Sequence, residues 1–179
     1  MPNIGIKVAQ GPADGKVGAA KGRRGGPFDK RRGGEYITHG ACDMNEDEAI
    51  GALLRAARVI AVVGLSADAD KPSNGVARYL QGKGFRVIPV NPGQGTILGE
   101  KSYKSLSDIP EKVDVVDIFM RSEKVLPVVE EAIKLRPKAI WLQLGISNEE
   151  AKAAATSAGI MFIEDKCVKQ EHARLVRPI

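Results

Sequence analysis

From residue 45 onward, short apolar runs alternate with segments in which apolar residues recur every three or four positions. Runs that are apolar on both faces are typical of parallel strands covered by helices, and the three- to four-residue spacing predicts helices. The predicted strands are 58–65, 86–90, 113–120, 138–145 and 160–164, and the predicted helices begin near residues 46, 73, 125, 148 and 168. This alternation predicts an α/β fold: a Rossmann-like, doubly wound parallel sheet of about five strands in a single domain.

Local signals mark where several helices begin and end. Asn45 and Glu48 form a capping-box pattern before the first helix, and Ser147 with Glu150 repeats that pattern before the fourth. Pro127 is expected in the first turn of the third helix or at its true start. Residues 93–107 are loop-like, with one possible short strand at 96–98.

In an open parallel sheet, ligands bind beyond the carboxyl ends of the strands, near the point where the strand order reverses. We therefore expect the site at that edge. The segments that end the five strands are Gly64–Ser66, Asn91-Pro92, Phe119–Arg121, Gln143–Gly145 and Asp165–Cys167.

The loop after the first strand has the chemistry of a phosphate site. Gly64 lets the backbone approach a ligand closely, Ser66 and Ser73 offer hydroxyl groups, and Lys71 offers positive charge. The helix that follows adds N–H groups and a partial positive charge at its start. The loop is not a GxGxxG motif, and Ser73 could instead serve only as the helix N-cap.

The end of the second strand discriminates between nucleotides. An NAD site requires Asp or Glu there to bind the ribose diol, whereas this chain has Asn91 followed by Pro92. The missing carboxylate argues against NAD and permits an adenine nucleotide with an additional phosphate. NADP stays open at this point.

Residues for catalysis are few. His39 lies in the N-terminal segment, and His172 is expected at the surface or end of the last helix rather than as a general base. Asp117, in an apolar strand, is expected to be buried and hydrogen-bonded. No metal-ligand spacing appears, and the two cysteines are too few for a disulfide framework. The chain therefore predicts a nucleotide-binding protein without visible catalytic machinery.

The positive charge is concentrated before the predicted domain. Residues 1–43 contain eight Lys and Arg against four Asp and Glu, whereas the remaining residues contain 19 against 18. We predict a disordered, basic, Gly/Arg-rich extension over 1–43 and a domain over 44–179. The extension could touch RNA, or it could precede a true start at Met44. Nucleic-acid binding by the nearly neutral domain is not expected.

No apolar run approaches membrane-spanning length, and no signal-peptide pattern is visible at the start. We expect a cytoplasmic protein with no membrane partner.

From about residue 47 to 175, the chain resembles the small stand-alone CoA-binding proteins. Their fold is similar to that of the CoA-binding domain of the succinyl-CoA synthetase alpha subunit. The motifs that carry the resemblance are Val-Val-Gly-Leu-Ser (62–66), Lys-Pro-Ser (71–73), Val-Ile-Pro-Val-Asn-Pro (87–92), Val-Asp-Val-Val-Asp-Ile-Phe (113–119), Trp-Leu-Gln-Leu-Gly-Ile (141–146), Asn-Glu-Glu-Ala (148–151), Asp-Lys-Cys (165–167) and Glu-His-Ala-Arg-Leu (171–175).

The resemblance implies coenzyme A as the ligand and assigns roles to nine residues. It implies that Gly64, Ser66, Lys71 and Ser73 surround the phosphates, that Asn91 and Pro92 flank the adenosine, and that Arg121, Gln143 and Gly145 line the rest. Family members tend to have arginine directly after the phenylalanine, where this chain has Met120 and then Arg121. The resemblance does not imply ligase activity, because the synthetase needs a phosphorylated histidine in a second domain.

We therefore expect a protein that binds CoA or acyl-CoA in a non-catalytic or regulatory role. An NADP-linked oxidoreductase with a Rossmann domain is the alternative. Cys167 follows the fifth strand at the expected ligand edge, with Lys166 and Lys169 close in sequence. It could form a mixed disulfide with the CoA thiol, or it could only pack as a small apolar residue.

Overall fold

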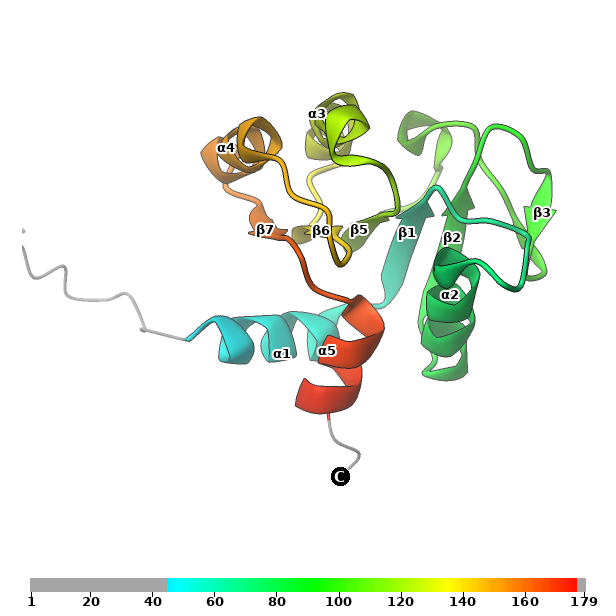
Figure 1. The fold of residues 1–179 in the computed structure, drawn as a ribbon, viewed down its shortest axis with the longest axis horizontal. Helices are drawn as coiled ribbons and strands as arrows, with labels where there is room; N and C mark the ends of the chain where they lie inside the picture. Colours follow the sequence, from blue (N-terminus) through cyan, green and yellow to red (C-terminus); the bar gives the residue numbers. More distant parts are fainter. Residues whose placement is uncertain (1–44, 177–179) are drawn as a thin grey trace, which may run out of the picture. The chain divides into compact units, whose positions relative to one another are not determined.

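Five parallel strands form the central sheet of the computed structural model, which describes residues 45–176 (Figure 1). Their order across the sheet is β2-β1-β5-β6-β7, so the predicted α/β fold with a parallel sheet is confirmed. The prediction for residues 1–43 lies outside the described residues. The strands are β1 (Val59–Val63), β2 (Arg86–Val90), β5 (Val115–Ile118), β6 (Ala139–Leu142) and β7 (Met161–Ile163).

The strand order reverses at β1. The chain passes from β1 to β2 on one side and then returns to place β5 on the other side of β1. In the register of these three strands, Val62 lies opposite both Pro89 and Asp117. The loops after β1 and β5 leave the sheet in different directions at such a point, which opens a crevice at the carboxyl edge.

Helices cover both faces of the sheet (Figure 1). One face is covered by α1 (Glu46–Ala56), α2 (Pro72–Gly82) and α5 (Val168–Leu175), and the other by α3 (Val125–Leu135) and α4 (Glu149–Ser157). The strands between them are buried on both sides, which explains their mostly apolar sequences.

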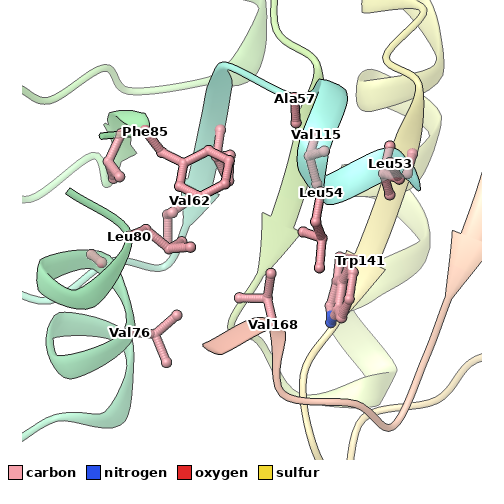
Figure 2. Close-up of a cluster of buried hydrophobic side chains, with 14 of the residues drawn as sticks. Leu53, Leu54, Ala57, Val62, Val76, Leu80, Phe85, Val115, Trp141 and Val168 are labelled. Carbon is pink, nitrogen blue, oxygen red and sulfur yellow. The ribbon is translucent and has the colours of Figure 1, made fainter. Parts of the chain in front are cut away.

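Trp141 is the largest fully buried side chain of the core beneath α1, α2 and α5. Its indole Nε1 donates a hydrogen bond to the Lys166 carbonyl at 2.6 Å. Without this bond, the buried N–H group would have no hydrogen-bond partner. Figure 2 shows apolar side chains from all three helices converging on the sheet around it. They include Leu53 and Leu54 from α1, Val76 and Leu80 from α2, and Val168 from α5.

Two predicted helix starts differ from the structure. Helix α2 begins at Pro72 with Lys71 as its N-cap, because proline is favoured at the first helical position and has no N–H to leave unpaired. Ser73 is therefore not the cap. Helix α4 is capped by Asn148, whose Oδ1 accepts from the Ala151 N–H at 2.9 Å, so the capping box predicted at Ser147 is wrong.

Other local predictions are confirmed. Asn45 and Glu48 form the reciprocal capping box of α1. Pro127 lies in the first turn of α3. The predicted loop at 93–107 contains a short antiparallel hairpin of β3 (Thr96–Ile97) and β4 (Glu100–Lys101), followed by a single 3-10 turn at Leu106–Asp108.

Every helix within residues 45–176 is too short or too polar to cross a bilayer.

Gly64 allows the loop after β1 to pass directly over the end of β5. Its φ is +79°, and a Cβ added there would lie 2.4 Å from the Phe119 carbonyl oxygen. That oxygen belongs to a main chain fixed by the Phe119 N–H, which donates to the Val63 carbonyl at 2.9 Å. A side chain at Gly64 would therefore force two strand ends apart.

We predict that Gly64→Ala lowers the free energy of unfolding by about 2–4 kcal/mol, since left-handed φ and the steric clash both oppose it. Urea unfolding measures the change. The matched control is Gly75→Ala, because Gly75 lies within α2 with nothing near its missing Cβ and should gain up to about 1 kcal/mol. Equal stability of the two variants would show that the close approach at Gly64 is not required.

Candidate functional site

A cavity of about 730 Å³ opens at the carboxyl ends of β1 and β5. It lies where the strand order reverses, between the β1–α2 loop, the segment after β5 and the turn after β6. The structure brings six of the nine predicted residues into its wall. They are Gly64, Ser66, Lys71, Ser73, Arg121 and Gly145, and the wall is completed by Pro72, Phe119, Met120, Ser122 and Ile146.

The loop after β1 is held against the first turn of α2 by side-chain hydrogen bonds. The Ser66 N–H donates to Ser73 Oγ at 3.1 Å, and the Ser66 carbonyl accepts from Asn74 Nδ2 at 2.9 Å. Both Ser73 and Asn74 are buried. Ser73 thus holds the loop in place, a role besides those of phosphate ligand and N-cap that the sequence suggested for it. Asn74 was not among the predicted site residues. Its position one residue after Ser73 was the only signal in the sequence.

Positive charge converges on this cavity from two sides. Helix α2 directs its N-terminus at the wall through Pro72 and Ser73, and a helix N-terminus carries a partial positive charge with unpaired N–H groups. Lys71, before α2, and Arg121, after β5, are both exposed and line the cavity. Neither cation forms an ion pair with a carboxylate of residues 45–176. The arrangement suits a multiply charged anion.

A second hollow of about 260 Å³ adjoins the first and shares Gly64 and Met120 with it. Asn91 and Pro92 line this smaller hollow, not the main cavity. Four of its other lining residues are apolar (Val63, Val90, Leu106 and Val128), and three are polar or charged (Lys104, Ser105 and Glu131). The two spaces together form a trough along the edge of the sheet.

Asn91 uses its side-chain amide to brace two loops. Its Nδ2 donates to the Leu65 carbonyl at 2.8 Å, and its Oδ1 accepts from the Gly93 N–H at 2.9 Å. A carboxylate could not make the first of these bonds, because it has no N–H to donate. The residue that argues against an NAD ribose site is thus also required by the loop structure.

Gln143 lines neither space, although the sequence predicted it in the wall. It is buried, and its Nε2 donates to Asp117 Oδ1 at 2.7 Å. Asp117 is fully buried, as expected, and its Oδ2 has no hydrogen-bond partner among the described residues. Burial raises the pKa of Asp117 to about 7, despite the hydrogen bonds from Gln143 and the Ile118 main chain, which lower it.

The turns after β5, β6 and β7 are tied together at the cavity rim. The Gly145 N–H donates to Asp165 Oδ1 at 2.7 Å, and the Asp165 N–H returns a bond to the Ile146 carbonyl at 3.2 Å. Asn148 Nδ2 donates to the Ser122 carbonyl at 3.0 Å. These bonds position the wall opposite α2, and Asp165 and Ser122 were not among the predicted residues.

His172 is buried, which corrects the expected surface position. Its Nδ1 lies 3.1 Å from the Tyr79 hydroxyl, and its ring meets the Phe85 ring edge-on at a centroid distance of 5.3 Å. Burial lowers the pKa of His172, and the positive charge of the nearby Lys83 lowers it further. The imidazole packs α5 onto α2 and does not line the cavity. No group of three His, Cys, Asp or Glu within residues 45–176 could hold a metal ion.

Cys167 is partly buried and precedes α5, where it packs against the core beneath α1, α2 and α5. It is not in the wall of the cavity or of the smaller hollow. Its environment is that of a packing residue, while its reactivity stays a prediction.

The fold is a Rossmann-like α/β domain with a cavity at the carboxyl edge of its parallel sheet, and comparison with known proteins identifies the family. The family model described as CoA binding domain matches residues 58–173, so the chain belongs to the CoA-binding domain family. The resemblance seen in the sequence is confirmed.

Relatives of two kinds share this domain. The uncharacterized protein YneT of Bacillus subtilis is 39% identical over 121 residues, which are 68% of this chain and 90% of that protein. A solved hypothetical protein from Pyrococcus horikoshii is 38% identical with a TM-score of 0.72, covering 76% of this chain and 96% of that one. The ADP-forming acetate–CoA ligase II of Archaeoglobus fulgidus is 33% identical over 110 residues, which are 60% of this chain and only 16% of the ligase.

We predict that Asp117→Asn removes a pH dependence of stability. The pKa of Asp117 is about 7 in the folded protein and about 3.9 in an unfolded chain. Between these values the folded state keeps a proton that the unfolded state releases. The free energy of unfolding should therefore fall as pH rises from about 4 and level off above about 7.

Urea unfolding of parent and variant between pH 5 and 8 measures the difference. His172 acts in the opposite direction below about pH 6.5, the ordinary value for histidine, but it is present in both proteins and cancels. A difference that stays constant over this range would contradict the raised pKa.

We also predict that CoA disulfide forms no adduct at Cys167 in the native protein, because this thiol packs against the core outside the cavity. Intact-mass spectrometry of the parent and of Cys167→Ser measures this, and the comparison accounts for Cys42. An adduct that the parent acquires and Cys167→Ser does not would instead support the redox role.

Proposed function

We propose that this protein binds coenzyme A or an acyl-CoA at the carboxyl edge of its sheet and acts as a binding or regulatory protein, not as an enzyme. The observation that carries the proposal is the cavity in which the α2 N-terminus, Lys71 and Arg121 converge, in a chain of the CoA-binding domain family. CoA carries its negative charge on a diphosphate and a 3′-phosphate, and this cavity offers the complementary charge.

The diphosphate would lie at the start of α2. There the Ser73 N–H and the Ser66 and Ser73 hydroxyls can donate to phosphate oxygens, with Lys71 as a mobile counter-charge. The Asn74 and Gly75 N–H groups already donate to the Lys71 carbonyl. Gly64 leaves room for the phosphates beside the main chain. Arg121 would approach the ligand from the segment after β5.

The adenosine would occupy the smaller hollow beside Asn91 and Pro92. Its mostly apolar walls suit a flat aromatic base, and Lys104 at its side can meet the additional phosphate. Met120 borders both spaces, where an arginine would add charge but a thioether adds only apolar contact. We propose that, with methionine at this position, binding of the phosphates depends more strongly on Lys71 and Arg121.

A non-catalytic role is supported by the residues near the cavity. His172 is engaged with Tyr79 in the core, and no nucleophile paired with a base lines the wall. The ligases that share this domain have long additional sequence, because the matched part is 16% of the acetate–CoA ligase II.

Calorimetric titration with CoA, acetyl-CoA, NADP and NAD tests the proposal. We expect CoA or acetyl-CoA to bind more tightly than either dinucleotide, because the chain belongs to the CoA-binding domain family and Asn91 provides no carboxylate for the ribose diol of NAD. Tighter binding of NADP would overturn the proposal and favour the oxidoreductase alternative. Comparing CoA with acetyl-CoA also shows whether the site prefers the free thiol or the thioester.

We predict that Lys71→Ala weakens CoA binding by about 1–2 kcal/mol, the free energy of a charge-assisted hydrogen bond, without changing the melting temperature. The same calorimetric titration measures the loss. Lys112→Ala is the matched control, because Lys112 is also exposed but precedes β5, at the opposite edge of the sheet. Equal affinity of both variants would remove Lys71 from the site.

A further inference from the structure

Asp117 lies directly beneath the cavity, one layer of side chains into the sheet. In the register of the central strands, Asp117 is opposite Val62 on β1 and Trp141 on β6. Each of these three positions is followed two residues later by a position at the carboxyl edge: Gly64, Phe119 and Gln143. Gly64 and Phe119 line the cavity. Two residues along a strand span about 6.6 Å. Asp117 therefore lies about 6.6 Å below the level of Gly64, Phe119 and Gln143.

The Asp117 carboxyl group has an unusual environment for a carboxylate. It is fully buried, its Oδ1 accepts from the neutral Gln143 amide, and its Oδ2 has no partner among residues 45–176. A buried carboxylate without a cation is costly, so such a group holds a proton or exchanges one near neutral pH. Oδ2 is the oxygen that can take the proton, since Oδ1 then keeps its bond from Gln143.

The surrounding elements do not supply a compensating charge. Towards this part of the sheet, α1, α2 and α5 present apolar side chains or the uncharged Ser73 and Asn74. His172 of α5 is engaged with Tyr79 and Phe85, and Cys167 packs against the same core. No charged side chain bonds to Asp117. The charged groups above it, at the cavity and its rim, are Lys71, Arg121 and Asp165.

We propose that Asp117 is a positioning residue of the nucleotide site that takes up a proton from solvent when a polyanionic ligand binds above it. The inference rests on the proposed function, because it needs phosphates in the cavity. Their negative charge disfavours a second negative charge below them, so Oδ2 becomes protonated. Neutral Asp117 keeps its Oδ1 bond to Gln143, which in turn holds the strand end that leads to Gly145.

The expected uptake follows from the separation of the charges. A unit charge about 10 Å away, in a medium of effective dielectric constant about 20, raises a pKa by about one. A change from about 7 to about 8 corresponds to an uptake of about 0.4 proton per ligand at pH 7. It also makes binding about eightfold tighter at pH 6 than at pH 9.

Calorimetric titration of the full chain at pH 7 in two buffers, PIPES and imidazole, measures the proton uptake. Because these buffers differ in ionisation enthalpy, the difference in binding heat reports the number of protons exchanged. The ligand is 3′-dephospho-CoA, whose diphosphate has no group that titrates near pH 7, and CoA is measured alongside it. We expect about 0.4 proton for the parent and none for Asp117→Asn.

Asp114→Asn is the matched control, since Asp114 precedes the same strand. Burial alone would raise the pKa of Asp114, but hydrogen bonds from the Arg58 and Val59 amides and from Lys138 outweigh burial and lower it. This group stays ionised at pH 7 with or without ligand. Asp114→Asn should therefore keep the proton uptake of the parent.

A second measurement does not depend on any variant folding. Carboxyl ¹³C NMR of the parent, labelled at aspartate, should show one carboxyl group with a pKa near 7. That pKa should rise by about one when CoA saturates the protein. Binding of 3′-dephospho-CoA without proton uptake, or equal uptake by Asp117→Asn, would overturn the inference alone. Absence of binding heat for both ligands would overturn the proposed function and the inference with it.

Discussion

The close approach of two main chains at the ends of β1 and β5 is the contact on which the rest of the site depends. Only a residue without Cβ fits where Gly64 meets the Phe119 carbonyl, because a Cβ would lie 2.4 Å from that oxygen. The approach keeps β1 and β5 paired up to their last residues, with the Phe119 N–H bonded to the Val63 carbonyl. From that shared end the two chains separate, one towards α2 and the other towards α3, and the cavity opens between them.

Polar side chains around this point serve two different purposes. The main chain of the β1–α2 loop is hydrogen-bonded by the side chains of Ser73, Asn74 and Asn91. These bonds fix the shape of the site. The Asp117 and Gln143 side chains bond to each other, one layer lower. The first group leaves the α2 N-terminus and two cations facing the cavity, while the second places a proton-binding group beneath it. The shape and the charge balance of the site thus come from separate networks.

The local elements and the family could be predicted from the sequence, because they depend on residues near one another along the chain. Apolar runs such as 59–63 identify buried parallel strands, and Asn45 with Glu48 marks a helix start through a bond between near neighbours. Helix starts were wrong only where two candidates compete within a few residues. Pro72 begins α2 ahead of Ser73, and Asn148 caps α4 instead of Ser147.

Only the tertiary structure decided which polar residues face the cavity. The sequence by itself determined the edge of the sheet where the candidate site lies, since parallel strands place all their carboxyl ends together. It could not distinguish Gly145, in the wall, from Gln143, buried beneath it, because this depends on the strand register and on Asp117, which lies 26 residues earlier. The burial of His172 between Tyr79 and Phe85 likewise depends on how α5 packs against α2. Such contacts join residues far apart in the chain, and no local pattern encodes them.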